Sequence, residues 1–224
     1  MTIDKVYSIV QFFYNKKQNG NITPEDFNLI APRAQISFIN GRITPKYDAK
    51  GNKTGWQADQ SIRRELSNIL KLNESIVVSG GIAAFPGEYI DWDSITTNGG
   101  ILIQEATPDE IAIMNQSVIT PPTAGFPKFV VSEEGFHIYP TSLTPIKLSY
   151  LRQPETPIWN YTVVSGQPVY AATGGVIGAG NSVDFELADI THLEIIMIIL
   201  QFFGVNLSLG ELTQFAMIKE KEGV

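Results

Sequence analysis

The sequence predicts an α+β fold in which N- and C-terminal helices form a bundle with a central antiparallel β-rich insertion. Apolar residues recur at helical spacing in 1–72 and again in 187–224. Between them, over 73–186, short alternating runs are separated by turns rich in Gly and Pro. We therefore expect a helical domain from 1–72 plus 187–224. The second domain, 73–186, is β-rich with a short helix near 108–116.

Two helices are predicted near the N-terminus. Apolar residues at helical spacing over 3–14 give the first helix one apolar face, and Gly20 ends the segment. Thr23-Pro24-Glu25-Asp26 opens the second helix, because Thr suits the N-cap, Pro suits the first helical position and acids favour the positive end of the helix dipole. Pro32 removes an internal hydrogen bond, so we expect a kink or a restarted helix there.

The remaining elements follow from changes of period along the chain. Residues 44–55 are a loop by composition, and a third helix is predicted over 57–71. The expected strands cover 76–78, 89–92, 101–104, 128–131, 135–139 and 146–151, and the last three are predicted to form an antiparallel meander. A second Thr-Pro-acid-acid opening at Thr107 starts the short helix. The Gly-rich segment 158–180 is expected to be a long loop or a hairpin.

The final helical region is predicted over 189–223. Residues 195–200 are apolar all round, which predicts a helix buried on all sides. A short amphipathic helix is expected over 209–221. The apolar stretch 195–209 contains polar residues and is shorter than the ~20 residues of a membrane span, and the first residues lack the layout of a signal peptide. We expect a soluble, cytoplasmically made chain that does not enter a membrane.

Composition and charge exclude several classes of protein. The net charge is −7, and no basic cluster is longer than Lys16-Lys17 or Arg63-Arg64. The protein is therefore not expected to bind nucleic acid directly by wrapping it. The chain has no cysteine, which excludes disulfide frameworks, thiolate metal sites and Cys nucleophiles. Hydrophobic residues make up 43% and charged residues only 17%. This sparse charge suits a subunit covered by neighbours, and equally an ordinary domain with a polar, uncharged surface.

The sequence holds no convincing catalytic, metal or cofactor motif. His137 and His192 are the only histidines, and neither has a metal-ligand spacing, so structural or surface roles are expected for both. The run Gly174–Gly180 invites a nucleotide-loop interpretation, but a helix is not predicted to follow it. A flexible loop is the expected alternative. We therefore predict a protein that is not an enzyme and has no cofactor or metal.

Several short motifs lie in a predicted strand pair that follows a helix and a Pro-rich link, and further motifs lie near both ends. The motifs are Thr120–Pro127, Phe136–Pro140, Ile146–Trp159, Thr23–Asn28, Ala34-Gln35, Phe203–Leu207 and Leu212–Ala216. Together they resemble structural proteins of crAss-like, Bacteroidetes-infecting tailed phages. The resemblance implies a head-to-tail connector, or ring protein, of the virion neck, stacked beneath the portal with the portal's twelve-fold symmetry. It carries over no catalytic residue.

A ring subunit of this kind implies particular partners. They are other copies of the chain, the portal and the adjacent neck or tail proteins, while DNA passes through the ring without sequence-specific binding. The protein is then expected in the virion neck or tail region after synthesis in the host cytoplasm.

Five residues are candidates for the contacts between subunits. Trp56, Trp159 and Tyr161 lie on predicted loop margins and are residue types that anchor interfaces. Each could instead pack onto its own domain. Arg63 and Arg64 could pair with acids of a neighbouring subunit, or form a solvated helix face.

Two other functions remain open at this point. One is a different virion component, such as a tail or minor capsid protein. The other is a non-catalytic binding module for carbohydrate or peptide that uses the Trp- and Tyr-rich β-region.

Overall fold

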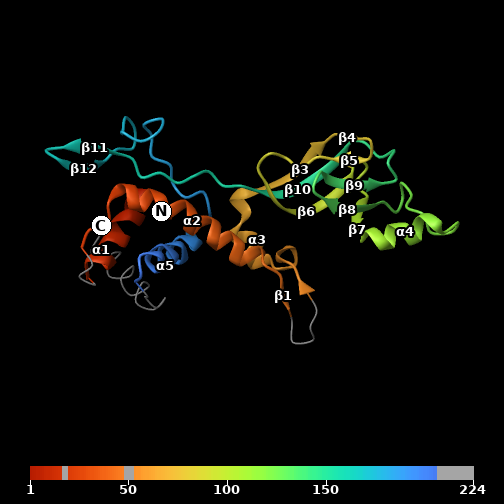
Figure 1. The fold of residues 1–224 in the computed structure, drawn as a ribbon, viewed down its shortest axis with the longest axis horizontal. Coiled ribbons are helices and arrows are strands. Elements are labelled where there is room, and N and C mark those ends of the chain that lie inside the picture. The colour runs from red at the N-terminus through yellow and green to blue at the C-terminus, as the bar shows by residue number, and fades with distance from the viewer. Residues whose placement is uncertain (17–19, 48–52, 206–224) are drawn as a thin grey trace. The chain divides into compact units, whose positions relative to one another are not determined.

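The chain divides into two compact units in the computed structural model, which describes residues 1–16, 20–47 and 53–205 (Figure 1). Unit 1 combines Met1–Asn68 with Pro154–Val224, and unit 2 is Ile69–Gln153. The segment 154–186, which the sequence analysis assigned to the β-rich domain, lies in unit 1. The chain therefore passes once into unit 2 and once out of it.

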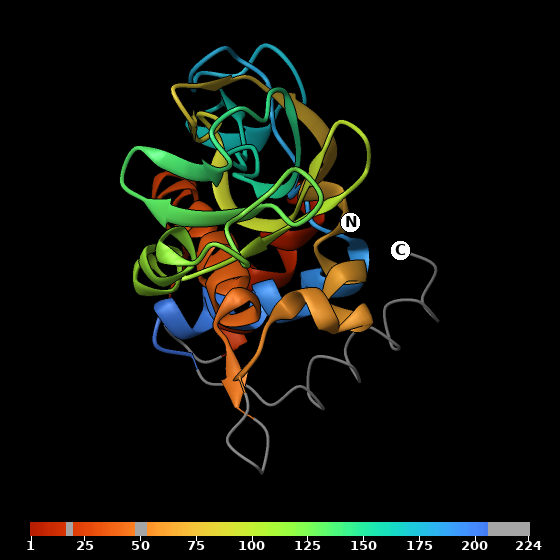
Figure 2. The ribbon, with the colours of Figure 1, turned by 90° about the vertical axis from the view of Figure 1, so that its right-hand side faces the viewer.

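Unit 2 contains an eight-stranded mixed sheet. Its order is β3-β10-β6-β7-β8-β9-β5-β4, in which only the β7–β8 pair is parallel. The strands are β3 (Leu70–Ile76), β4 (Val78–Ser79), β5 (Ile82–Ala83), β6 (Tyr89–Thr97), β7 (Leu102–Glu105), β8 (Lys128–Ser132), β9 (Gly135–Tyr139) and β10 (Ile146–Arg152). Helix α4 (Pro108–Gln116) connects β7 to the segment before β8, and Figure 2 views the unit from the side of this helix.

The sheet of unit 2 is nearly closed and barrel-like. Strands β3 and β4 stand at opposite ends of the sheet order, yet only Val77 separates them in the sequence. The last residue of β3 and the first of β4 are two Cα–Cα steps apart, at most about 7 Å, so the two ends of the sheet lie next to each other. Curling a sheet in this way hides most of the unpaired backbone that its edges would expose.

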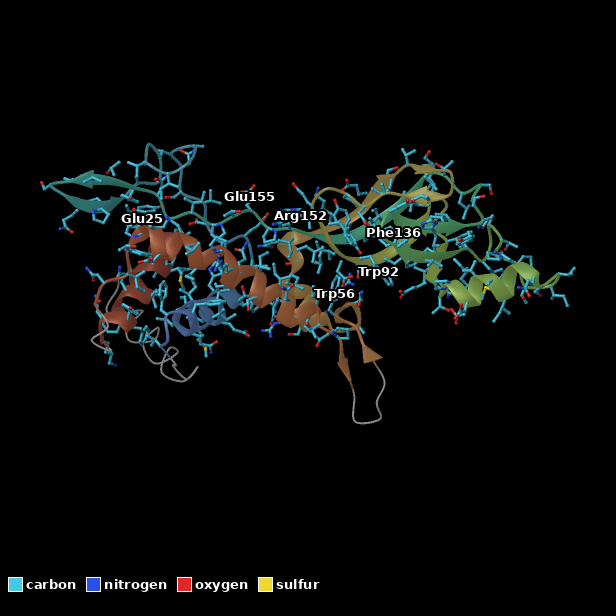
Figure 3. The ribbon with its side chains drawn as sticks, in the orientation of Figure 1. Glu25, Trp56, Trp92, Phe136, Arg152 and Glu155 are labelled. Atoms are coloured by element: carbon cyan, nitrogen blue, oxygen red, sulfur yellow. The ribbon has the colours of Figure 1, made fainter. Side chains whose placement is uncertain are left out.

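The core of unit 2 lies inside this curved sheet. Strand β10 is almost continuously buried and pairs with β3 on one side and β6 on the other. Phe129, Phe136 and Tyr150 are among the largest fully buried side chains. Phe85, Tyr89 and Trp92 pack against them from partly buried positions, and Figure 3 shows Trp92 and Phe136 within this part of the unit.

The predicted fold class is therefore wrong. A helical bundle with a central antiparallel insertion was expected, but the largest element is the nearly closed mixed sheet, and the described residues contain five short helices. The predicted meander is also wrong, because β8 pairs with β9 but β10 does not. Strand β10 instead pairs with β3 and β6, so the order of the sheet is set by contacts with distant segments rather than by succession along the chain.

The helices of unit 1 come from both parts of the chain. Helix α1 (Ile3–Lys16) and helix α2 (Pro24–Ile43) both pack against α5 (His192–Phe202). Thr23 caps α2 by accepting a hydrogen bond from the backbone N–H of Asp26. Helix α2 runs continuously through Pro32, so the alternative of a restarted helix is wrong.

Two other helix predictions need correction. The third helix covers only α3 (Gln60–Glu65), between 3₁₀ turns at Trp56–Ala58 and Ser67–Ile69, and β3 starts at Leu70. The 3₁₀ spacing of three residues buries Leu66 and Ile69 much as a continuing helix would, so apolar periodicity does not separate the two. The last helix ends at Phe202, and the amphipathic helix predicted over 209–221 lies outside the described residues.

Short strands complete unit 1. β1 (Lys46–Tyr47) pairs with β2 (Lys53–Thr54) within the predicted loop 44–55. β11 (Tyr161–Val164) and β12 (Gln167–Tyr170) form a separate antiparallel hairpin, which extends beyond helices α1 and α2 in Figure 1. Of the two alternatives for 158–180, a hairpin is therefore present.

We predict that Phe129→Ala destabilises unit 2 by about 3–5 kcal/mol, because it leaves a cavity between the buried ring of Phe136 and the partly buried ring of Trp92. Urea unfolding followed by circular dichroism measures the change in the free energy of unfolding. Val131→Ala on the same strand is the control, since Val131 is 43% exposed and its truncation should cost about 1 kcal/mol or less. Equal losses in the two variants would contradict this description of the core.

Candidate interaction surface

Trp159 anchors the start of the hairpin segment to the helices of unit 1. Its ring stacks on Tyr7 with centroids 4.2 Å apart, and its Nε1 donates to Asp4 Oδ1 at 3.0 Å. Asn28 on α2 holds the Trp159 backbone at both ends, accepting from its N–H at 2.7 Å and donating to its carbonyl at 2.9 Å. Trp159 is only 3% exposed. Its position is therefore fixed by packing and hydrogen bonds together.

Asn160 organises the Gly-rich loop that follows the hairpin. Its side chain is fully buried, its Oδ1 accepts from the N–H of Ile177 at 2.9 Å, and its Nδ2 donates to the Ile177 carbonyl at 2.7 Å. The Asn160 N–H donates to Ser182 Oγ at 2.9 Å. A Cβ at Gly175 would lie 2.1 Å from Asn160 Oδ1, so only glycine fits there. The loop is held by side-chain bonds, and residues 181–188 directly after it are not helical, so its end offers no helix N-terminus to a phosphate.

The hairpin is also tied to α2 through Tyr161. The Tyr161 hydroxyl donates a hydrogen bond to the Glu25 carboxylate in the first turn of α2, where Figure 3 labels Glu25. This bond raises the pKa of Tyr161 and lowers the pKa of Glu25. The rings of Tyr161 and Tyr170 lie 6.0 and 5.9 Å from Trp159. The base of the hairpin is thus an aromatic cluster that belongs to unit 1 itself.

The outer part of the hairpin has the opposite character. Val163, Val164 and Val169 are 61%, 55% and 47% exposed, although they are β-branched and apolar. The 28 residues of 156–183 contain no Asp, Glu, Lys, Arg or His. We call residues 161–170 the hairpin arm. A projecting, uncharged and apolar element of this kind is typical of a surface that another protein covers.

A second uncharged apolar surface projects from unit 2. Residues 111–127, which we call the α4 arm, contain no charged residue or histidine. Val118, Ile119 and Phe126 are 96%, 91% and 80% exposed. Their backbone is nevertheless hydrogen-bonded, since Ser117 Oγ accepts from the N–H groups of Ile119 and Thr120, and the Phe126 N–H donates to Thr123. In the α4 arm, polar groups hydrogen-bond to one another while apolar side chains are exposed to solvent. This combination also favours an interaction surface.

The predicted interface residues are not brought together at either arm. Trp56 is 2% exposed, and the Arg63 guanidinium lies 6.0 Å from the centroid of its ring, so both interact within unit 1. Arg64 is exposed on α3. Trp159 is buried, and Tyr161 lies at the base of the hairpin arm rather than at its tip.

The sequence analysis missed the exposed valines of the hairpin arm and the apolar residues of the α4 arm. The signal that could have found them is the absence of charge over 111–127 and 156–183. The covered Trp159 ring also weakens the binding-module hypothesis, because a carbohydrate platform needs an exposed aromatic face. Trp92 packs edge-on against Phe129 at 5.2 Å in the core of unit 2.

The two histidines occupy different environments. His137 is partly buried on β9, and His192 at the start of α5 is 2% exposed with its Nε2 3.0 Å from the Leu187 carbonyl. The residues described here contain no cluster of three or more His, Cys, Asp or Glu side chains suited to a metal ion. None of their helices is long and apolar enough to cross a membrane. No known family model matches the chain, and no curated protein sequence matches it either.

We predict that Asn160→Ala lowers the free energy of unfolding of unit 1 by about 1–3 kcal/mol, because it removes the partner of the partly buried Ile177 N–H and leaves the Ile177 carbonyl with the Gly180 N–H alone. Hydrogen exchange of 174–182, measured by mass spectrometry, should become faster in this variant. Asn181→Ala is the matched control, since Asn181 is exposed and contributes only its carbonyl to the network. Unchanged exchange in Asn160→Ala would contradict the role given to Asn160.

His192 should make unit 1 less stable in mild acid. Burial disfavours the charged imidazolium and lowers the pKa of His192 below its ordinary value of 6.5. As the pH falls below 6.5, the unfolded chain takes up the proton first, so the free energy of unfolding decreases until the folded-state pKa is reached. Urea unfolding at about pH 7.5 and about pH 5.5 measures this loss. His192→Gln, whose amide can donate to the Leu187 carbonyl, should show a smaller loss, and an equal one would exclude His192 as the cause.

Proposed function

We propose that this chain is a structural subunit of a tailed-phage virion that assembles with copies of itself into a ring of the neck, between portal and tail. The observation that carries the proposal is the pair of projecting, uncharged apolar arms, in which Val118, Ile119 and Val163 are more than half exposed. Monomeric soluble proteins rarely keep such surfaces uncovered. The motifs that resemble crAss-like phage structural proteins support the choice of a virion.

A ring needs contacts between two different surfaces of each subunit. Contact of one patch with itself produces a two-fold dimer, whereas contact between different patches continues around a ring. The chain has two separate apolar arms, one in each unit, which is the minimum that a head-to-tail arrangement requires. The acidic net charge of −7 suits a subunit past which DNA slides without adhering.

A structural role also agrees with the way polar groups are used in the described part of the chain. The side chains of Asn28, Asn160 and Ser182 form hydrogen bonds with backbone groups of other segments. We therefore include in the proposal that the protein is not an enzyme and needs no cofactor. Portal and neighbouring neck or tail proteins are the proposed hetero-partners.

Immunogold labelling of the particles of the phage that encodes this chain tests the proposal. We expect gold at the head–tail junction, both in whole virions and in emptied particles whose necks are exposed. Gold confined to the capsid or the distal tail would overturn the neck assignment while keeping a virion role. Absence of gold from both preparations, with the antibody binding the denatured chain on a blot as a control, would overturn the virion role as well.

A further inference from the structure

The outer edge of strand β11 is open for pairing with another strand. Val163 faces Pro168 across the hairpin, and proline has no N–H to donate. Opposed residues in an antiparallel ladder either exchange both hydrogen bonds or neither, so this is a non-hydrogen-bonded pair. The N–H and C=O groups of Val163 therefore point away from β12, toward the free side of β11.

The outward N–H and C=O groups of Tyr161, two residues closer to the base of the hairpin, are hydrogen-bonded within the chain. The Tyr161 carbonyl accepts from the Val176 N–H at 2.9 Å, and the Tyr161 N–H donates to Asn160 Oδ1 at 3.0 Å. No comparable bond within the described part of the chain reaches the outward groups of Val163. The open edge thus begins where the anchoring of the hairpin ends.

Other strand edges of the protein carry protection that β11 lacks. The outer edge of β12 contains Pro168, β3 is interrupted by a register shift at Asn73, and β4 has only two residues. Edge strands are commonly protected by Pro, a bulge, short length or an inserted Lys. β11 has four residues and contains no Pro, bulge or Lys, and its residues Thr162, Val163 and Val164 are the β-branched types that favour strands.

We propose that the open edge of β11 pairs with an extended segment of a second copy of this chain, which deepens and rests on the proposed assembly into a ring. Charge favours this occupant. Each copy carries a net charge of −7, so two copies repel where their acids meet. The uncharged span 156–183 lets identical acidic chains approach without that repulsion. A basic partner would instead be expected to meet an acidic surface.

Strand addition at this edge combines two kinds of contact. The outward N–H and C=O of Val163 supply backbone hydrogen bonds, and the exposed side chains of Val163, Val164 and Val169 supply apolar area. An isolated two-stranded hairpin is marginally stable, so extension to a third strand also stabilises the arm. The anchored base keeps the edge in one orientation, which reduces the entropy lost on association.

The variant Val163→Pro tests how much the Val163 N–H contributes to the association of two copies. The N–H that it removes is not part of the β11–β12 ladder, so the hairpin retains its own hydrogen bonds. Val163→Thr is the matched control, because it keeps the N–H and the β-branched shape while removing apolar surface. Sedimentation equilibrium and native mass spectrometry should show oligomers for the wild type. The dissociation constant should rise at least about tenfold in Val163→Pro and clearly less in Val163→Thr.

A labelling experiment keeps the proposal testable if Val163→Pro does not fold. The chain has no native cysteine, so Val163→Cys introduces a single thiol. Its reaction with a maleimide should be about tenfold slower at concentrations that favour the oligomer than after dilution. Val77→Cys, at a position 75% exposed in unit 2, should react at the same rate in both conditions.

Three outcomes would overturn the pairing with a second copy. They are a wild type that stays monomeric at its highest soluble concentration, an oligomer that Val163→Pro leaves unchanged, and a Val163→Cys thiol that is equally reactive in both states. None of them removes the virion role, which the immunogold experiment decides separately. Gold at the neck together with an unaffected oligomer would assign the β11 edge to another chain or to solvent.

Discussion

Unpaired backbone groups at strand edges are the constraint on which most of this structure depends. An exposed row of N–H and C=O groups invites any other strand, so each edge has to be paired, covered or interrupted. Unit 2 meets this requirement by curling, since the single residue Val77 joins the strands at the two ends of its sheet order. Pro168 interrupts one edge of the hairpin. The edge at Val163 has no such device, and it is the edge that we propose pairs with a second copy of the chain.

The hairpin arm combines a rigid base with an apolar tip. The Trp159 ring stacks on Tyr7, and the Asn28 side chain hydrogen-bonds to the Trp159 backbone. The buried Asn160 side chain adds further hydrogen bonds, so the base is held in place. The tip presents valines to solvent in a span without charge. Fixed placement of an apolar surface reduces the entropic cost of association, whereas a freely moving loop would have to be ordered first. The hydrogen bonds that hold the Gly-rich loop therefore also help to hold the base from which the exposed arm extends.

The aromatic candidates show that a residue's type does not determine whether it lies on an exposed surface. Trp56 and Trp159 are the kinds of residue that anchor interfaces, but here both stabilise unit 1 from within. Valine is a weak interface marker by type, yet Val163 and Val118 occupy the exposed, uncharged positions. The surfaces that we propose for interaction are thus marked by exposure and by missing charge, more than by large aromatic side chains.

The sequence by itself determined the local features. The helix starts at Thr23 and Thr107 follow from caps whose partners lie within three residues. The strands predicted over 128–131 and 146–151 follow from composition and lie within β8 and β10. Tertiary structure alone decided what depends on distant partners. The place of β10 between β3 and β6 rests on pairing with segments far away in the sequence. Local patterns fix conformation because their energy terms are local, whereas sheet order and exposure are set by contacts that no short stretch of sequence contains.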